Sequence, residues 1–355
     1  MKAVVLKRNG VLEIEERLTP IPGPNECLVK IRCAGICSSD ISRSFENGSY
    51  GYPLVMGHEL SGEVISKGVD VINFKAGQRV AIFPLKPCFN CQSCKKGEFA
   101  QCSSYDYYGS RCDGGYSEFL SVNEWNLLPI PDNVLFRDAA LLEPMSVVVH
   151  ALRRAEINEK FSLKGGRVAI IGAGFLGLIA IKILKHQYPN IEVAVFDRNL
   201  FKVNIANKCG AIATVLSDED AWRKYLEKIS CGYDVVIEAT GVPESYSHSI
   251  KLASNSGCVV WMGNPTADIF LQKTIVSSIL RKEIRIMGTW NSFFKSPVDD
   301  DWITALDLLS SGISPSSLVT HHGSIDEIPI FLERLYLHKA AKTRFDHVKL
   351  VIENA

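Results

Sequence analysis

The sequence predicts an α/β protein with two domains, one β-rich and one built on a doubly wound parallel sheet. Its 355 residues exceed the roughly 250–300 at which a single core stops growing, so two cores are expected. The first ~145 residues contain short β-prone runs, whereas strand-length apolar runs alternate with helix-length segments from Arg167 onward. This change of pattern separates the two domains.

Short runs of β-branched and aromatic residues, separated by turn formers, predict strands in the first half at residues 4–6, 28–31, 62–65, 79–83 and 115–122. In the second half, strands are expected at residues 167–171, 193–197, 234–238, 257–262 and 284–288. We therefore expect one domain at residues 1–148, a second at 149–289, and a return to the first at 290–355.

The composition and charge of the chain argue against nucleic acid or a membrane as its binding partner. With 46% hydrophobic and 22% charged residues, the chain is typical of a globular protein. Its 39 basic residues balance 39 acidic ones, so no overall field attracts nucleic acid or an anionic membrane. The longest nearly apolar stretch, residues 168–181, is shorter than the ~18–20 residues that span a bilayer, and no signal-peptide pattern begins the chain. We expect a soluble, cytoplasmic protein with a small-molecule partner.

A cluster of cysteines marks a metal-binding lobe at about residues 84–105. In a chain without a secretion signal, cysteines indicate metal or thiol chemistry rather than disulfides. Four thiolates in one loop can enclose an ion tetrahedrally with no open position, as a structural zinc site requires. Iron–sulfur clusters use similar spacings, so spacing alone leaves both open. The cysteines of this lobe are Cys88, Cys91, Cys94 and Cys102.

A second candidate metal site is dispersed over three segments: Cys37, the pair His58-Glu59, and Glu143. A thiolate, an imidazole and a carboxylate can bind zinc and leave a fourth position for water or a substrate oxygen. Taken singly, each residue has an ordinary explanation, as a core cysteine, a turn histidine or a surface carboxylate. However, Glu143 lies inside an apolar run, where an unpaired carboxylate is costly.

A glycine-rich turn follows the first predicted strand of the second domain. The spacing G-x-G-x-x-G between a strand and a helix is typical of a dinucleotide site, where helix N-terminal amides hold the pyrophosphate. Asp197 ends the next strand, where a carboxylate can accept hydrogen bonds from ribose hydroxyls, and this favours NAD. Its neighbour Arg198 is compatible with NADP. The residues of the turn are Gly172, Gly174, Phe175, Leu176 and Gly177.

The order of these features resembles the zinc-containing medium-chain dehydrogenases over essentially the whole chain. In that family, sorbitol-dehydrogenase-like members carry glutamate at the position of Glu143, where alcohol dehydrogenases proper usually carry cysteine. The resemblance therefore implies the polyol branch. It also implies a GroES-like β catalytic domain with an inserted Rossmann domain, one catalytic and one structural zinc ion, NAD, and a homodimer or homotetramer.

The resemblance implies roles for single residues. Ser39 is similar to the family's hydroxyl proton relay, and a turn-stabilising serine is the alternative. Glu59 is similar to a glutamate that ligates the catalytic metal in some states or supports its ligands. Lys202 matches a position near the adenosine. With Cys37, His58 and Glu143, these residues make up the expected site.

The implied reaction is hydride transfer from a secondary alcohol to NAD, because zinc makes an alcohol oxygen far easier to deprotonate. Residues 84–89, 105–106, 109–111, 113–115 and 279–283 narrow the resemblance to a polyol-phosphate enzyme. A free polyol or L-threonine is the alternative substrate.

Other features complete the set of expectations. Arg43 or Lys295 is the cation expected to meet a phosphate. The pair His321-His322 is expected in a surface loop. A zinc ribbon that binds nucleic acid is the non-enzymatic alternative, but zero net charge and the glycine-rich turn argue against it.

Overall fold

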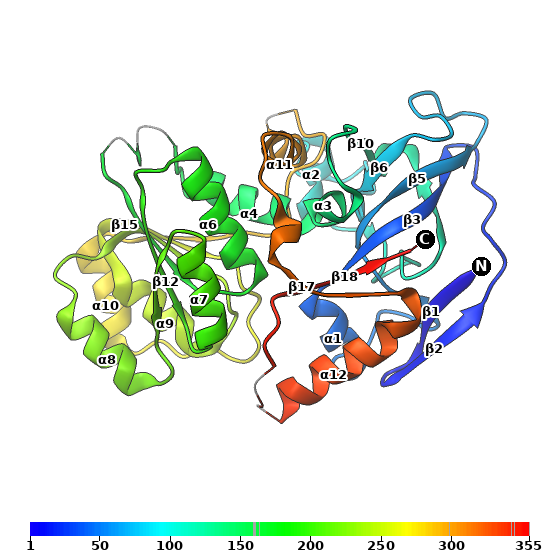
Figure 1. Cartoon of the computed structure of the whole chain (residues 1–355). Coiled ribbons are helices and arrows are strands. Elements are labelled where there is room, and N and C mark those ends of the chain that lie inside the picture. The colour runs from blue at the N-terminus through cyan, green and yellow to red at the C-terminus, as the bar shows by residue number, and fades with distance from the viewer. Residues whose placement is uncertain (159–160, 163, 298, 342, 344, 355) are drawn as a thin grey trace. The chain divides into compact units, whose positions relative to one another are not determined.

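The computed structural model describes residues 1–158, 161–162, 164–297, 299–341, 343 and 345–354. The chain divides into two compact units, one formed by Met1–Ser146 and Phe293–Ala355 and the other by Val147–Ser292 (Figure 1). From the sequence, these divisions are expected at residues 148–149 and 289–290. Within the described part of the chain, no helix is both long and apolar enough to cross a bilayer.

The first unit consists mainly of antiparallel strands: β1 (Lys2–Arg8), β2 (Val11–Glu16), β3 (Glu26–Ile36), β4 (Leu54–Val55), β5 (Glu59–Lys67), β6 (Arg79–Ile82), β7 (Leu85–Lys86), β8 (Asp106–Tyr107), β9 (Phe119–Asn123), β10 (Leu127–Pro129), β17 (Val319–Gly323) and β18 (Lys349–Glu353). Seven form one sheet, in the order β10-β6-β5-β3-β18-β17 with β9 also paired to β3. Among the strand pairings described for this sheet, β17–β18 is parallel and the others are antiparallel. The pairing of β18 with β3 joins the C-terminal segment to the first unit.

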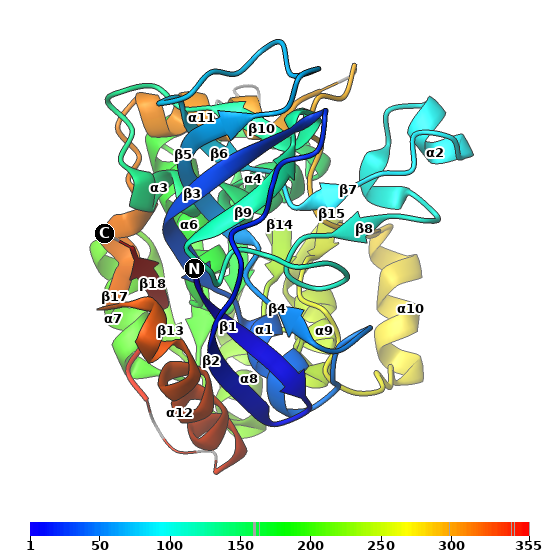
Figure 2. The same cartoon turned by 90° about the vertical axis from the view of Figure 1, so that its right-hand side faces the viewer.

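Helices α1 (Ser38–Phe45), α2 (Gln92–Lys95), α3 (Phe136–Ala140), α11 (Asp301–Ser310) and α12 (Ile328–Ala340) accompany these strands, and α4 (Leu142–Arg154) begins in the first unit and continues into the second. The core forms because residues two apart on a strand share a face. Val29 and Ile31 of β3 are fully buried, in the same apolar cluster as Leu60 and Val64 of β5. Figure 2 shows the loop that carries α2 extending from the β7–β8 pair.

The second unit is a six-stranded parallel sheet with helices: β11 (Arg167–Ile171), α6 (Phe175–Gln187), β12 (Glu192–Asp197), α7 (Leu200–Lys208), β13 (Ile212–Val215), α8 (Glu219–Lys228), β14 (Tyr233–Glu238), α9 (Pro243–Leu252), β15 (Ala253–Trp261), α10 (Lys273–Lys282) and β16 (Arg285–Gly288). The strand order β13-β12-β11-β14-β15-β16 is that of a doubly wound dinucleotide-binding sheet. The predicted α/β fold class is therefore confirmed.

Several sequence expectations differ from the structure. In the first unit the predicted runs do not include β2, β4, β7, β8, β10, β17 or β18, and the run at residues 115–122 forms a strand only from Phe119. Strand β13 is missing from the predicted set, because it is a short edge strand without a buried apolar run, and Ile212 is 64% exposed. The expected loop at His321-His322 is wrong, since both residues belong to β17. This strand pairs with β18 on one side only, so polar side chains are tolerated, and His322 lies 3.0 Å from Glu353.

The environment of His248 in the second unit predicts that the protein becomes less stable as pH falls. Its ring stacks on Trp222 with centroids 4.2 Å apart, and Nε2 lies 3.0 Å from a Glu219 oxygen. Burial lowers the pKa of His248 more than Glu219 raises it. The unfolded chain therefore binds the proton more tightly, and the free energy of unfolding should fall as pH drops below about 6.5.

Urea unfolding at a series of pH values checks this expectation. His248→Phe keeps an aromatic ring against Trp222 but cannot titrate, so its unfolding free energy should depend less on pH between about 7 and 5. The same pH dependence in variant and wild type would exclude His248 as the source.

Candidate metal centre and dinucleotide site

Cys37 stands where β3 ends and α1 begins. It caps the helix, and its backbone N–H donates to Asp40 Oδ2 at 3.1 Å. Asp40 occupies the third helical position, as in a capping box, so the local sequence fixes this carboxylate. Tyr116 Oη also donates to Oδ2 at 2.7 Å, and Arg43 Nη1 donates to Oδ1 at 3.2 Å. Cys37 is therefore anchored to a fully buried, well-partnered carboxylate.

The same carboxylate faces His58. Asp40 Oδ1 lies 3.4 Å from Nδ1 of His58, a charge contact outside hydrogen-bond geometry. Burial raises the pKa of Asp40, but His58, Arg43 and Tyr116 outweigh burial and lower it to about 2. A carboxylate beside one ring nitrogen orients the imidazole for a metal. Sequence reasoning missed Asp40, although its place three residues after Cys37 was the available signal.

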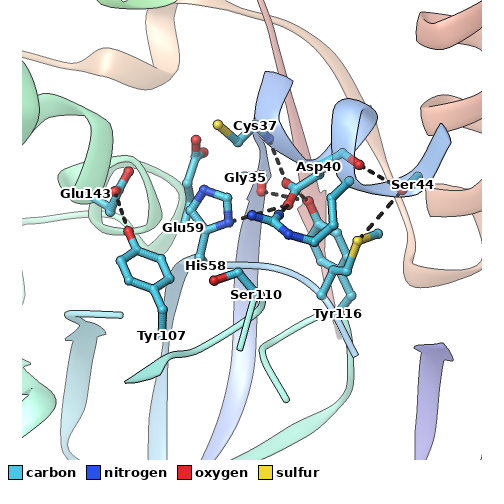
Figure 3. Close-up of polar contacts among 12 residues, drawn as sticks. Gly35, Cys37, Asp40, Ser44, His58, Glu59, Tyr107, Ser110, Tyr116 and Glu143 are labelled. Atoms are coloured by element: carbon cyan, nitrogen blue, oxygen red, sulfur yellow. Dashed lines mark hydrogen bonds and ion pairs between the residues drawn. The ribbon is translucent and has the colours of Figure 1, made fainter. Parts of the chain in front are cut away.

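The structure brings Cys37, His58 and Glu59 together, with one candidate ligand atom from each within 4.8 Å of the others (Figure 3). His58 immediately precedes β5 and Glu59 begins it, and β5 pairs with β3 next to Cys37. Burial lowers the pKa of His58, but Asp40 and Cys37 raise it by a larger amount. The net shift of the pKa is therefore upward. Sulfur, imidazole and carboxylate are all established zinc ligands.

Lys349 forms an ion pair with one carboxylate oxygen of Glu59, and the other oxygen has no hydrogen-bond partner among the described residues. Its Nζ donates to Glu59 Oε1 at 2.6 Å, and both side chains are buried. Glu59 Oε2 is buried without a hydrogen-bond partner among the described residues. Gly35 makes room for this carboxylate, because a Cβ there would lie 1.9 Å from Oε2. A buried, unsatisfied carboxylate oxygen is costly unless a cation binds it, so these residues fit a metal ion.

Glu143 lies beside this group. It occupies the first turn of α4, is 8% exposed, and its Oε1 accepts a hydrogen bond from Tyr107 Oη at 3.1 Å. Figure 3 shows it across the His58 ring from Asp40. Burial raises the pKa of Glu143 to about 7, and Glu59 adds to this while His58 opposes it. Such a carboxyl group can hold or release a proton near neutral pH. Direct metal ligation by Glu143 stays a prediction.

The four thiols of the lobe face one another. The Sγ atoms of Cys88, Cys91, Cys94 and Cys102 all lie within 4.8 Å of one another, with Cys88 and Cys94 4.0 Å apart. Tetrahedral zinc requires sulfurs about 3.8 Å apart. Backbone N–H groups of Cys94 and Ser103 lower the pKa of Cys91 to about 5, whereas burial raises that of Cys94 to about 12. The lobe therefore fits a fully enclosed metal ion.

The glycine-rich turn joins β11 to α6. Gly172 has a φ of 106°, which favours glycine, and a Cβ at Gly177 would lie 2.0 Å from the Gly172 carbonyl oxygen. A Cβ at Gly174, the N-cap of α6, would meet no described atom within 4 Å. Phe175 is buried and Leu176 half-buried. The open space at this helix N-terminus fits a pyrophosphate.

Asp197 is fixed beside that turn at the end of β12. Its Oδ2 accepts the backbone N–H of Ala173 at 2.7 Å, and Oδ1 accepts that of Asn199 at 2.8 Å. A carboxylate has about four acceptor sites, so lone pairs remain for ribose hydroxyls. Lys202 lies in the first turn of α7 and is half-buried.

Three further residues are expected at the site from the sequence: Ser39, Arg43 and Lys295. Ser39 lies exposed in the first turn of α1. Arg43 is engaged by Asp40. Lys295 Nζ donates to the carbonyl oxygens of Trp125 at 2.8 Å and Leu127 at 3.4 Å, and burial lowers its pKa. Both cations expected at a phosphate are thus used within the fold.

Two family models match the chain: an alcohol dehydrogenase GroES-like domain over residues 23–132 and a zinc-binding dehydrogenase over residues 176–311. With the fold and the two groups of side chains that could hold a metal ion, these matches define an oxidoreductase. The chain belongs to the zinc-binding alcohol dehydrogenase family. The GroES-like plus Rossmann architecture expected from the sequence is confirmed.

Individual relatives show which members of this family the chain is similar to. Galactitol 1-phosphate 5-dehydrogenase of Escherichia coli (strain K12) is 33% identical, over 92% of this chain and 94% of the relative. The crystal structure of galactitol-1-phosphate dehydrogenase from Escherichia coli has a TM-score of 0.89 and 31% identity, and the match covers 100% of both chains. A zinc-binding dehydrogenase from Sinorhizobium meliloti 1021, bound to NADP, has a TM-score of 0.87 and 27% identity, covering 99% of each chain. The narrower resemblance expected from the sequence, to galactitol-1-phosphate 5-dehydrogenase, is confirmed.

Proposed function

We propose that this protein is a zinc-dependent oxidoreductase that transfers hydride between a secondary alcohol of a polyol phosphate and NAD. One observation carries the proposal: Cys37, His58 and Glu59 form a group in which a buried carboxylate oxygen has no hydrogen-bond partner in the described chain. Similarity to the galactitol-1-phosphate enzymes supports a substrate of that chemical class.

The chain's own residues have separate roles in this proposal. Cys37, His58 and Glu59 hold the catalytic zinc, which when bound stabilises negative charge on the alcohol oxygen. Glu143, buried beside these residues and hydrogen-bonded to Tyr107, is the further carboxylate proposed to ligate the ion. The exposed hydroxyl of Ser39 passes protons toward solvent.

We assign the second zinc to the four-cysteine lobe, where it is structural, and NAD to the glycine-rich turn. Asp197 supports NAD because its carboxylate would repel a 2′-phosphate. The exposed neighbour Arg198 and the NADP-bound relative favour the alternative, NADP. Lys202 is proposed to contact the adenosine end of the cofactor.

We further propose a homodimer or homotetramer in the cytoplasm. A reducing compartment is supported by the eleven cysteines, which form no disulfide in the described chain. The family resemblance supports the oligomer.

A substrate panel tests the function. The zinc-loaded protein is given galactitol 1-phosphate, free galactitol, sorbitol or L-threonine, each with NAD or NADP, and the absorbance of the reduced cofactor is followed. We expect kcat/KM for galactitol 1-phosphate with NAD to exceed every other combination by about tenfold or more. Preference for a free polyol or threonine overturns the proposed substrate, and oxidation of no alcohol at all overturns the dehydrogenase proposal.

A further inference from the structure

Arg111 is an exposed cation in contact with two aromatic rings. Its guanidinium carbon lies 4.4 Å from the ring centroid of Tyr50 and 4.2 Å from that of Tyr105. Nη1 also donates to the Tyr105 carbonyl oxygen at 3.2 Å. Stacking on tyrosine rings restrains the guanidinium, and its planar fork of N–H donors suits phosphate.

One tight turn connects Arg111 to the candidate metal centre. The carbonyl oxygen of Tyr107 accepts the backbone N–H groups of Ser110 at 3.1 Å and Arg111 at 2.9 Å. Tyr107 in turn donates to Glu143, and its ring centroid lies 5.9 Å from that of His58. Figure 3 shows Ser110 next to His58. The backbone that carries Arg111 is therefore fixed at the edge of the metal centre.

Arg43, Lys349 and Lys295 already have partners within the fold. Arg43 lies 3.2 Å from Asp40, and Lys349 lies 2.6 Å from Glu59. Lys295 donates to two carbonyl oxygens. Arg111 differs from Arg43 and Lys349 because no carboxylate pairs with it among the described residues. Its charge is therefore available to an anionic ligand.

We propose that Arg111, held by Tyr50 and Tyr105, binds the phosphate monoester of the substrate and sets the preference for phosphorylated over free polyols. The inference rests on the proposed function, because it needs a substrate with both a secondary alcohol and a phosphate. The phosphate dianion accepts hydrogen bonds from guanidinium N–H groups of Arg111. The carbon chain between phosphate and alcohol then spans the distance from Arg111 to the metal centre.

The test compares wild type, Arg111→Ala and Arg111→Lys as zinc-loaded enzyme with NAD. For Arg111→Ala, the ratio of kcat/KM for galactitol 1-phosphate to that for free galactitol should fall about 10- to 100-fold, because charge-assisted hydrogen bonds contribute this much. Most of the change should appear in KM. Arg111→Lys should fall between the two, because it keeps the charge but loses the planar fork.

Inorganic phosphate supplies a second readout. It should inhibit oxidation of free galactitol by the wild type, and Arg111→Ala should need a correspondingly higher concentration for the same inhibition. Arg8→Ala, which removes an exposed arginine at the end of β1, is the matched control and should keep the wild-type ratio.

The outcomes separate the two proposals. If the wild type prefers galactitol 1-phosphate and Arg111→Ala keeps both the substrate ratio and the phosphate inhibition, the role of Arg111 is wrong while the proposed function stands. If the wild type prefers free polyols, the proposed substrate and the role of Arg111 both fail. Zinc content and circular dichroism identify a variant that has merely misfolded. If Arg111→Ala misfolds, the substrate ratio and phosphate inhibition of Arg111→Lys test the role of Arg111 instead.

Discussion

Replacing Cys37 with alanine should lower kcat by about a thousandfold or more, because the proposed catalytic zinc contributes several kcal/mol of transition-state stabilisation. The variant should also lose one of two zinc ions per chain, since only His58 and Glu59 would remain from the group within 4.8 Å. Zinc content by mass spectrometry and steady-state kinetics check the two parts separately.

Cys33→Ala is the matched control. Cys33 is a buried cysteine on β3, four positions before Cys37, and it belongs to neither group of metal-binding side chains. We expect this variant to keep both zinc ions and most of its activity. A Cys37→Ala protein with both zinc ions and wild-type turnover would show that the metal centre is misassigned.

Replacing Cys102 with alanine should remove the other zinc ion and unfold the lobe. The lobe has little apolar support besides Phe89 and Phe99, whose rings lie 5.0 and 5.2 Å from that of Trp125. A structural zinc site contributes folding free energy directly, so its loss should lower the midpoint of thermal unfolding by several degrees. Trypsin should cleave after the exposed Lys95 or Lys96 about tenfold faster or more.

Cys112→Ala controls for the loss of a thiol, because Cys112 is half-buried and outside the four-cysteine group. Its zinc content and trypsin cleavage rate should match those of the wild type. Cys102→Ala with two zinc ions and an intact lobe would contradict a structural metal there. Because each ligand variant should lose a different zinc ion, Cys37→Ala and Cys102→Ala together distinguish the two sites.

Sequence reasoning succeeded where interacting residues are close in the chain. The four cysteines of the lobe lie in one loop, and the glycine-rich turn lies between consecutive elements. Short loops and tight turns restrict the backbone strongly, so spacing alone predicts their geometry. The buried strands β11, β12 and β14 of the second unit were predictable for a related reason, because an apolar run identifies a strand without knowledge of its neighbours, whereas the buried strand β18 of the first unit was missed.

The residues that support the metal centre escaped prediction because their partners are distant in sequence. Lys349 meets Glu59 across 290 residues, and Tyr107 meets Glu143 across 36. Arg111 also depends on a contact between residues distant in sequence, since its stacking partner Tyr50 comes from another segment. The local pattern around Tyr107 and Arg111 does not differ from that of an ordinary surface tyrosine or arginine, whereas Lys349 stands next to the apolar residues of β18.

By itself, the sequence determined the kinds of donor atoms, the four-thiol lobe and the turn for a dinucleotide. Only the tertiary structure decided that Glu59 joins Cys37 and His58 within 4.8 Å, and that Glu143 lies beside them (Figure 3). The physical reason is strand register: β3 pairs Gly35 with Glu59 on one side and with Val351 on the other. A shift of one residue in either pairing would turn these side chains to the opposite face.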